Sequence, residues 1–190
     1  ELKLSTDQQV AFELIKENFE QKPVCLLHGI TSSGKTEIYI KLIEEYLITG
    51  KQVLYLLPEI ALTAQLVSRL RAHFGNKVAV YHSKYSNNER VEVWNQVLLN
   101  AEKAQIVIGA RSALFLPYQD LGFVVIDEEH EQTFKQSDPA PRYHARDAAI
   151  VLANAHQAKV LLGSATPSIE TYYNAVSGKF GFVEIMKRFG

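Results

Sequence analysis

One segment, residues 29–36 with the sequence GITSSGKT, constrains the fold of this chain more than any other feature. It fits the pattern G-x-x-x-x-G-K-[ST], which binds phosphate where it joins a strand to a helix. The apolar run at residues 24–28 is typical of a strand, and the spacing of apolar residues over 36–48 is typical of a helix. Such a pattern can arise by chance, but this context favours a phosphate-binding loop.

The chemistry of this loop predicts a site for the β and γ phosphates of a nucleotide that also binds Mg²⁺. Glycines let the backbone wrap a phosphate, and the N–H groups at a helix N-terminus attract anions. Lys35 would neutralise the β and γ phosphates, and the Thr36 hydroxyl would bind Mg²⁺. The predicted ATP-binding residues of the loop are Gly29, Ile30, Thr31, Ser32, Ser33, Gly34, Lys35 and Thr36.

The rest of the chain alternates short apolar runs with helical patterns. The runs are continuous, which is typical of parallel strands covered on both faces; they span residues 24–27, 53–57, 78–81, 106–108, 123–126 and 160–162. Helical spacing covers residues 6–20, 36–48, 60–73, 87–99, 143–156 and 168–176, with Thr6 and Gln9 placed as a capping box. This rhythm predicts an α/β three-layer sandwich, a mostly parallel sheet with helices on both faces.

The length of 190 residues suits one domain, which we expect to span residues 1–190. Residues 133–142 contain two close prolines and are expected to form an exposed loop inside that domain. The tail at residues 180–190 is either a last strand or a connection onward. The large apolar residues Trp94, Tyr81, Leu98 and Leu99 are expected in the core.

Two acidic residues follow the apolar run at residues 123–126. In a parallel sheet, ligands bind at the carboxyl ends of the strands. Asp127 would hold Mg²⁺, through water, beside Thr36, and Glu128 would orient or deprotonate the attacking water. The alternative is a solvated acidic start of a helix. The phosphate loop upstream favours the catalytic interpretation, so Lys35, Asp127 and Glu128 are the predicted catalytic residues.

Composition excludes several other classes of protein. Twenty Lys and Arg oppose 21 Asp and Glu, so the chain has no overall basic character, although a local basic patch remains compatible with DNA binding. The single cysteine, Cys25, excludes an internal disulfide and a Cys-rich zinc site; a zinc triad of His82, His130 and His144 lacks a recognisable ligand spacing. We therefore expect no zinc. No apolar run approaches the roughly 20 residues of a membrane span, and a cytoplasmic location is expected.

Several longer strings resemble a known family. Residues 127–130 (DEEH) and 163–168 (GSATPS) resemble motifs II and III of superfamily 2 helicases of the DExH type. Residues 56–63 (LLPEIALT), 108–117 (IGARSALFLP) and 4–8 (LSTDQ) resemble motif Ia, motif Ib and the N-terminal glutamine motif. Together with residues 141–147 (PRYHARD), these strings make the chain similar to the bacterial replication-restart DNA helicases.

This resemblance implies a RecA-like, P-loop NTPase first lobe of a 3′–5′ DNA helicase that restarts stalled replication forks and assembles the primosome. The implied partners are forked or single-stranded DNA, a second helicase lobe in the same protein, primosome proteins and single-strand-binding protein, without any membrane. It implies a nucleoid-associated location and a zinc site elsewhere in the parent protein. The lobe alone is expected to be nearly inactive.

The resemblance also implies roles for individual residues. Gln8 would contact adenine. Thr63, Arg111 and Ser112 would bind the DNA backbone, with a surface salt bridge as the alternative for Arg111. Phe134 and Tyr143 would stack on bases and couple DNA binding to hydrolysis, or would instead anchor the loop to the core. The full set of residues expected in DNA binding or coupling is Thr63, Arg111, Ser112, His130, Phe134, Lys135, Arg142, Tyr143, Ser164 and Thr166.

Two other functions are alternatives to the helicase. A GTPase normally carries an Asn-Lys-x-Asp guanine reader, and the segment at 76–79 (NKVA) lacks the aspartate; the DEEH and GSAT strings also argue against a small-molecule kinase. A docking or scaffold module remains an alternative for a single lobe. A silent homologue would be expected to lose Lys35 or Glu128, and both are present.

Overall fold

The computed structural model describes residues 2–30 and 33–186. Within these residues a seven-stranded sheet has the order β3-β4-β2-β5-β8-β1-β9, and every neighbouring pair is parallel. The strands of the sheet are β1 (Val24–Gly29), β2 (Gln52–Leu56), β3 (Val78–Tyr81), β4 (Ile106–Gly109), β5 (Leu121–Asp127), β8 (Lys159–Ser164) and β9 (Gly181–Ile185). The α/β prediction with a parallel sheet is confirmed.

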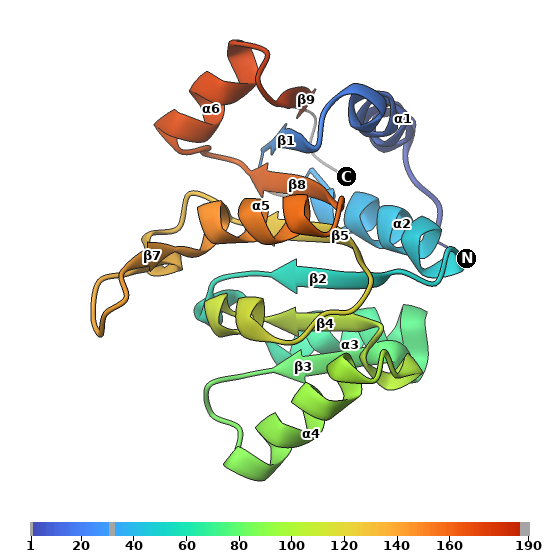
Figure 1. The fold of residues 1–190 in the computed structure, drawn as a ribbon. Helices are drawn as coiled ribbons and strands as arrows, with labels where there is room; N and C mark the ends of the chain where they lie inside the picture. Colours follow the sequence, from blue (N-terminus) through green and yellow to red (C-terminus); the bar gives the residue numbers. More distant parts are fainter. Residues whose placement is uncertain (1, 31–32, 187–190) are drawn as a thin grey trace.

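Helices cover both faces of this sheet (Figure 1). The helices are α1 (Thr6–Gln21), α2 (Lys35–Ile48), α3 (Ala64–Phe74), α4 (Asn87–Leu98), α5 (Ala145–Ala155) and α6 (Ile169–Val176). Short 3-10 turns are η1 (Glu59–Ala61), η2 (Gly75–Lys77), η3 (Glu102–Ala104), η4 (Arg111–Phe115) and η5 (Gln132–Phe134). No helix of the described residues is long and apolar enough to cross a membrane.

The core consists of two apolar layers, one on each face. Successive residues of a strand point to opposite faces, so Leu54 and Leu56 enter one layer while Val53 and Tyr55 enter the other. Helices α1, α2 and α3 pack on the layer that contains Tyr55, and α4, α5 and α6 pack on the other. Double coverage explains why the strands are continuous apolar runs.

Several local predictions were wrong. The capping box of α1 is formed by Ser5 and Gln8 rather than by Thr6 and Gln9: Ser5 N donates to Gln8 Oε1 at 2.8 Å, and Gln8 N donates to Ser5 Oγ at 3.3 Å. The helix predicted from residue 60 begins at Ala64, because Thr63 supplies the cap, and residues 59–61 form the separate turn η1.

The segment predicted as a plain loop contains a short antiparallel hairpin. Strand β6 (Lys135–Gln136) pairs with β7 (Tyr143–His144), so α5 begins at Ala145 and not at residue 143. This hairpin lies on the side of the molecule to which the carboxyl ends of the strands point (Figure 1). In the tail, residues 181–185 form β9 beside β1, while residues 187–190 lie outside the described residues.

The core prediction also failed on the outer face of α4. Trp94 is 43% exposed, and Leu98 and Leu99 are exposed as well, whereas Tyr81 is buried as expected. The residues of α4 that face the sheet are Val93 and Val97. Apolar spacing alone did not identify which side of this helix is covered. Cys25 is fully buried in β1.

Candidate active site

The phosphate loop joins β1 to α2, as its sequence predicts. Gly34 has a φ of 77° and occupies the N-cap of α2, where no side chain caps the helix. The first N–H groups of α2 are therefore not held by a side-chain cap and suit an anion. A Cβ at Gly34 would displace the end of the Gln8 side chain, and the positive φ favours glycine at this position. Thr31 and Ser32 lie outside the described residues.

The side chains around the loop fit a phosphate group. Lys35 Nζ donates to the carbonyl of Gly29 at 2.8 Å, so its ammonium group lies within the loop. The hydroxyl of Ser33 is buried and has no hydrogen-bond partner in the described structure. A buried unpaired hydroxyl is unfavourable unless a ligand satisfies it. Backbone donors, a cation and this hydroxyl together form a site for the phosphates of a nucleotide.

Gln8 is fully buried and connects α1 to the phosphate loop. Its side-chain Nε2 donates to the carbonyl of Gly34 at 3.1 Å, while its Oε1 accepts from Ser5 N. The residue therefore lies at the loop, as expected from the glutamine motif. Its contact with adenine stays a prediction.

Asp127 is the last residue of β5 and is held by two tyrosines. Tyr39 of α2 donates its hydroxyl to Oδ1 at 3.0 Å, and Tyr55 of β2 donates to Oδ2 at 3.2 Å. The backbone N–H of Glu128 also donates to Oδ1, at 3.1 Å. Sequence analysis missed both tyrosines. Their helical and strand spacing marked them only as apolar positions.

The electrostatics of Asp127 suit a bound cation. Burial raises the pKa of the Asp127 carboxyl, the charge of Glu128 raises it further, and Tyr39, Lys35 and Tyr55 act in the opposite direction. Burial also raises the pKa of Tyr39 and of Tyr55 well above the ordinary value, so both hydroxyls keep their protons and can donate. A half-buried carboxylate that makes no ion pair with a cationic side chain in the described structure is a suitable place for Mg²⁺.

Within residues 2–30 and 33–186, no group of three His, Cys, Asp or Glu side chains could hold a metal ion. The zinc triad of His82, His130 and His144 is therefore not assembled. A magnesium ion that relies on one carboxylate, waters and the substrate phosphates does not need such a cluster.

Glu128 begins a polar chain that reaches the GSATPS segment. Its backbone φ is 52°, an uncommon value for a non-glycine residue that is often found at functional positions. His130 Nε2 lies 3.7 Å from Glu128 Oε2, and His130 Nδ1 is hydrogen-bonded to Ser164 Oγ at 2.6 Å. Ser164 Oγ in turn accepts from Thr166 N at 3.0 Å. Motifs II and III are thus joined, and buried Ser164 serves this connection rather than an exposed contact.

Glu129 lies in a second network that sequence analysis did not predict. Its carboxylate is fully buried and accepts from Arg146 Nη1 at 3.3 Å, Ser168 N at 2.8 Å and Thr171 Oγ1 at 2.8 Å. Its own N–H donates to the carbonyl of Gly163 at 3.1 Å. These bonds tie the end of β5 to α5 and α6. Three acids follow the apolar run at residues 123–126, and the sequence does not show that Glu129 differs from the other two.

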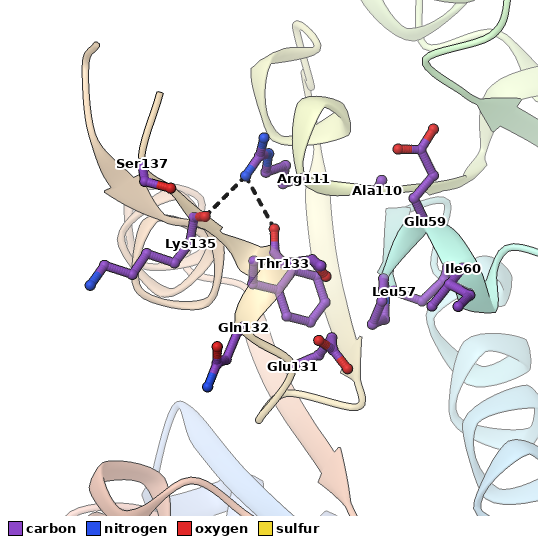
Figure 2. Close-up of a pocket in the computed structure, with 12 residues that line it drawn as sticks. Leu57, Glu59, Ile60, Ala110, Arg111, Glu131, Gln132, Thr133, Lys135 and Ser137 are labelled. Carbon is purple, nitrogen blue, oxygen red and sulfur yellow. Dashed lines mark hydrogen bonds between the residues drawn. The ribbon is translucent and has the colours of Figure 1, made fainter. Parts of the chain in front are cut away.

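Arg111 holds the hairpin rather than a carboxylate. Figure 2 shows its guanidinium reaching the hairpin, where Nη1 donates to the carbonyls of Thr133 and Lys135, each at 3.1 Å. The surface salt bridge considered for Arg111 is absent from the described structure. The bonds place Arg111 beside a pocket lined by the segments that follow β2, β4 and β5. Both bonds come from the same nitrogen, Nη1, and both acceptors are backbone oxygens of one short segment.

Two aromatic residues, Phe134 at the end of η5 and Tyr143 in β7, are anchored by packing. Phe134 is 1% exposed and packs in the core layer with α5, so in this structure its ring cannot stack on a base; anchoring is what the geometry shows. Tyr143 is partly exposed and packs edge-on against Phe115, with ring centroids 5.3 Å apart. Lys135 and Arg142 are exposed, as DNA contacts require. Thr63 caps α3 through its Oγ, and Ser112 lies in η4.

Comparison with known proteins agrees with this geometry. A family model for the DEAD/DEAH box helicase matches residues 5–175. The replication restart protein PriA of Bacillus subtilis (strain 168) is 44% identical over 189 residues, which cover 98% of this chain and 23% of that protein. PriA of Haemophilus influenzae is 46% identical over 191 residues, covering 100% and 25%. This chain spans about a quarter of the length of these relatives.

Solved structures support the fold. RecG bound to a three-way DNA junction has a TM-score of 0.70 at 21% identity, covering 100% of this chain and 24% of that one. The helicase MrfA bound to DNA has a TM-score of 0.68 at 19% identity, covering 97% and 27%. At these identities the likeness shows the fold alone; together with the family model it confirms the expected RecA-like lobe.

Proposed function

Because this chain belongs to the DEAD/DEAH box helicase family, we propose that it is the ATP-binding motor lobe of a 3′–5′ DNA helicase that restarts stalled replication forks. The observation that carries the proposal is its 44–46% identity, over nearly its whole length, to proteins named replication restart protein PriA. The family implies ATP binding, and the phosphate loop fits it.

In the proposed reaction, each residue at this edge of the sheet has a separate task. Lys35 binds the β and γ phosphates, and the first N–H groups of α2 orient them. Thr36 and Asp127 would hold Mg²⁺, which supplies charge neutralisation between the phosphates when bound. Glu128 orients or deprotonates the attacking water, and its carboxylate lies near His130.

DNA would cross the face formed by the segments after β2 and β4. Thr63, Arg111 and Ser112 lie on these segments, and exposed Lys135 and Arg142 on the hairpin add positive charge. We infer that the hairpin couples DNA to ATP through Arg111 and partly exposed Tyr143, with Phe134 as the anchor. His130, Ser164 and Thr166 would transmit the change to Glu128.

The proposal extends to parts that lie outside this chain. Residues 1–190 would form one domain and act with a second helicase lobe, whose arginine can be worth about 10³–10⁵ in rate. The whole protein would carry zinc outside this lobe, bind forked or single-stranded DNA, and meet primosome proteins and single-strand-binding protein at the nucleoid. These partners follow from similarity to the PriA relatives.

The test compares the 190-residue chain with a version extended through its native continuation. ATPase rate is measured with and without forked DNA, and Lys35→Ala in each version controls for contaminating ATPase. We expect strong DNA stimulation only in the extended protein. Strong DNA-stimulated turnover by the short chain would contradict the need for a second lobe. If the extended protein shows no DNA-stimulated ATP turnover, the proposed function as a DNA helicase is wrong.

A further inference from the structure

Tyr39 and Tyr55 lie on either side of the Asp127 carboxylate, and neither side chain is exposed to solvent. Tyr39 and Tyr55 are fully buried, their rings meet edge-on at a centroid distance of 5.8 Å, and each hydroxyl donates to a different oxygen of Asp127. Because the bonds come from α2 and from β2, they hold the carboxylate from two sides. One bond would fix the position of one oxygen; two bonds fix the plane of the group.

We propose that Tyr39 and Tyr55 are positioning residues that set the orientation of Asp127 for the Mg²⁺ of a bound nucleotide. The inference rests on the proposed function, since it concerns the same site. Oδ1 accepts from Tyr39 and from the backbone N–H of Glu128, whereas Oδ2 accepts from Tyr55 alone, so Oδ2 keeps a lone pair for a water around the metal. Partners of this kind commonly set metal affinity although they do not touch the metal.

The position of Tyr39 links the metal acid to the phosphate loop. Tyr39 lies one helical turn after Lys35 on α2, so any shift of α2 moves both the phosphate-binding ammonium and the hydroxyl that holds Asp127. Gly163 of β8 is part of this arrangement, because a Cβ there would collide with the Tyr39 hydroxyl. The Tyr39 hydroxyl therefore explains why the GSAT string has glycine at residue 163, where a larger residue would not fit.

Packing alone does not explain the hydroxyls. The same core layer contains phenylalanines, among them Phe19 and Phe123, so an apolar ring is compatible with it. Burying a hydroxyl is unfavourable unless it is hydrogen-bonded. The bond to Asp127 is the one that both buried hydroxyls make in the described structure. Phenylalanine at either position would keep the ring contacts and remove only the bond.

The experiment measures metal binding directly in the full-length protein, with Mn²⁺ as the probe. Mn²⁺ bound in the presence of ADP is titrated by electron paramagnetic resonance for Tyr39→Phe, Tyr55→Phe and the double variant. ADP affinity in EDTA is measured in parallel. Tyr46→Phe is the matched control, because Tyr46 is on the same helix, stacks on Phe123 and makes no bond to Asp127.

We expect each single variant to bind Mn²⁺ about 10-fold more weakly, and the double variant more weakly still. ADP affinity in EDTA and the Tyr46→Phe protein should match the wild type. Wild-type Mn²⁺ affinity in both tyrosine variants would overturn the inference and leave the proposed function intact. An equal loss of ADP affinity in EDTA would also overturn it, because the hydroxyls would then hold the phosphate loop. Wild-type protein that binds no Mn²⁺ with ADP would overturn the proposed function as well.

Discussion

Asp127 and Glu129 are two residues apart on one segment, yet their surroundings differ in kind. Asp127 accepts hydrogen bonds from two tyrosine hydroxyls and a backbone N–H, all of them uncharged donors. Glu129 accepts from the Arg146 guanidinium as well as from Ser168 and Thr171. The charge of Glu129 is thus compensated by a cation of the protein. The carboxylate of Asp127 is oriented by neutral donors, and its charge is available to a bound cation.

The difference shows that two neighbouring acids can differ in whether the protein itself compensates their charge. A buried charge is tolerated when a counter-charge and hydrogen bonds surround it, as at Glu129. A carboxylate held only by neutral donors keeps its attraction for a cation. We expect the two acids to respond oppositely to removal of their charge, and the following changes test that expectation.

The largest effect on stability is expected at Glu129. Glu129→Gln leaves the buried Arg146 without its deepest counter-charge, and breaking such a pair typically costs about 3–5 kcal/mol. Urea unfolding would measure the change in the free energy of unfolding. Glu131→Gln, a partly exposed acid two residues along, serves as the control and should change little. If Glu129→Gln lowers the free energy of unfolding no more than Glu131→Gln does, the hydrogen-bond network of Glu129 adds nothing to stability.

Asp127→Asn should lose function without losing stability. The raised pKa of Asp127 means that its charged form is disfavoured in the folded state, so its contribution to stability declines as the pH rises above the ordinary value of 3.8. At neutral pH asparagine removes that disadvantage, and the melting temperature should stay the same or rise. Mg²⁺-dependent ATP binding should weaken by about 10- to 100-fold. A loss of stability as large as that of Glu129→Gln would remove the distinction between the two acids.

The smallest effect is a pH dependence of the Glu129 region. Burial lowers the pKa of His144, and the neighbouring Arg146 lowers it further, whereas Asp147, Glu129 and Glu170 oppose this. His144 Nδ1 accepts from Arg146 N at the start of α5, which requires the unprotonated nitrogen. Because the unfolded chain binds the proton more readily, stability should fall as the pH drops through about 6.5.

His144→Asn should keep the cap and flatten that pH dependence, and His144→Ala should cost about 1 kcal/mol at pH 7.5. Melting temperatures at pH 7.5 and pH 5.5 provide the measurement. If the asparagine variant loses as much stability on acidification as the wild type, another group is responsible and the Glu129 region is not the acid-sensitive one.

Local patterns predicted much of the fold and the site. Continuous apolar runs located six strands of the sheet, and the phosphate-loop pattern located Gly34 and Lys35 at the start of α2. The run before Asp127 placed it at the end of a strand, as found in β5. These predictions succeeded because each depends on residues close together in the sequence. The cap at Ser5 and the start of α3 were missed by only a few residues, where competing polar residues offered alternative caps.

Other predictions failed because sequence did not show which side of an element is covered. Trp94 has helical apolar spacing but lies on the outer side of α4, and Phe134 follows an acidic segment but lies in the core. Covering a side chain depends on elements far away in the sequence, so neighbouring residues do not reveal it.

The sequence by itself determined the layer architecture, the phosphate loop and the position of Asp127 at the end of a strand, because strand periodicity and loop chemistry are local properties. Only the tertiary structure decided that Tyr39 and Tyr55 hold Asp127, while Arg146 compensates Glu129. The partners come from α2, β2 and α5, which the order of the strands brings to one edge of the sheet. The role of each carboxylate follows from the charge of the donors around it, and those donors meet only when the chain has folded.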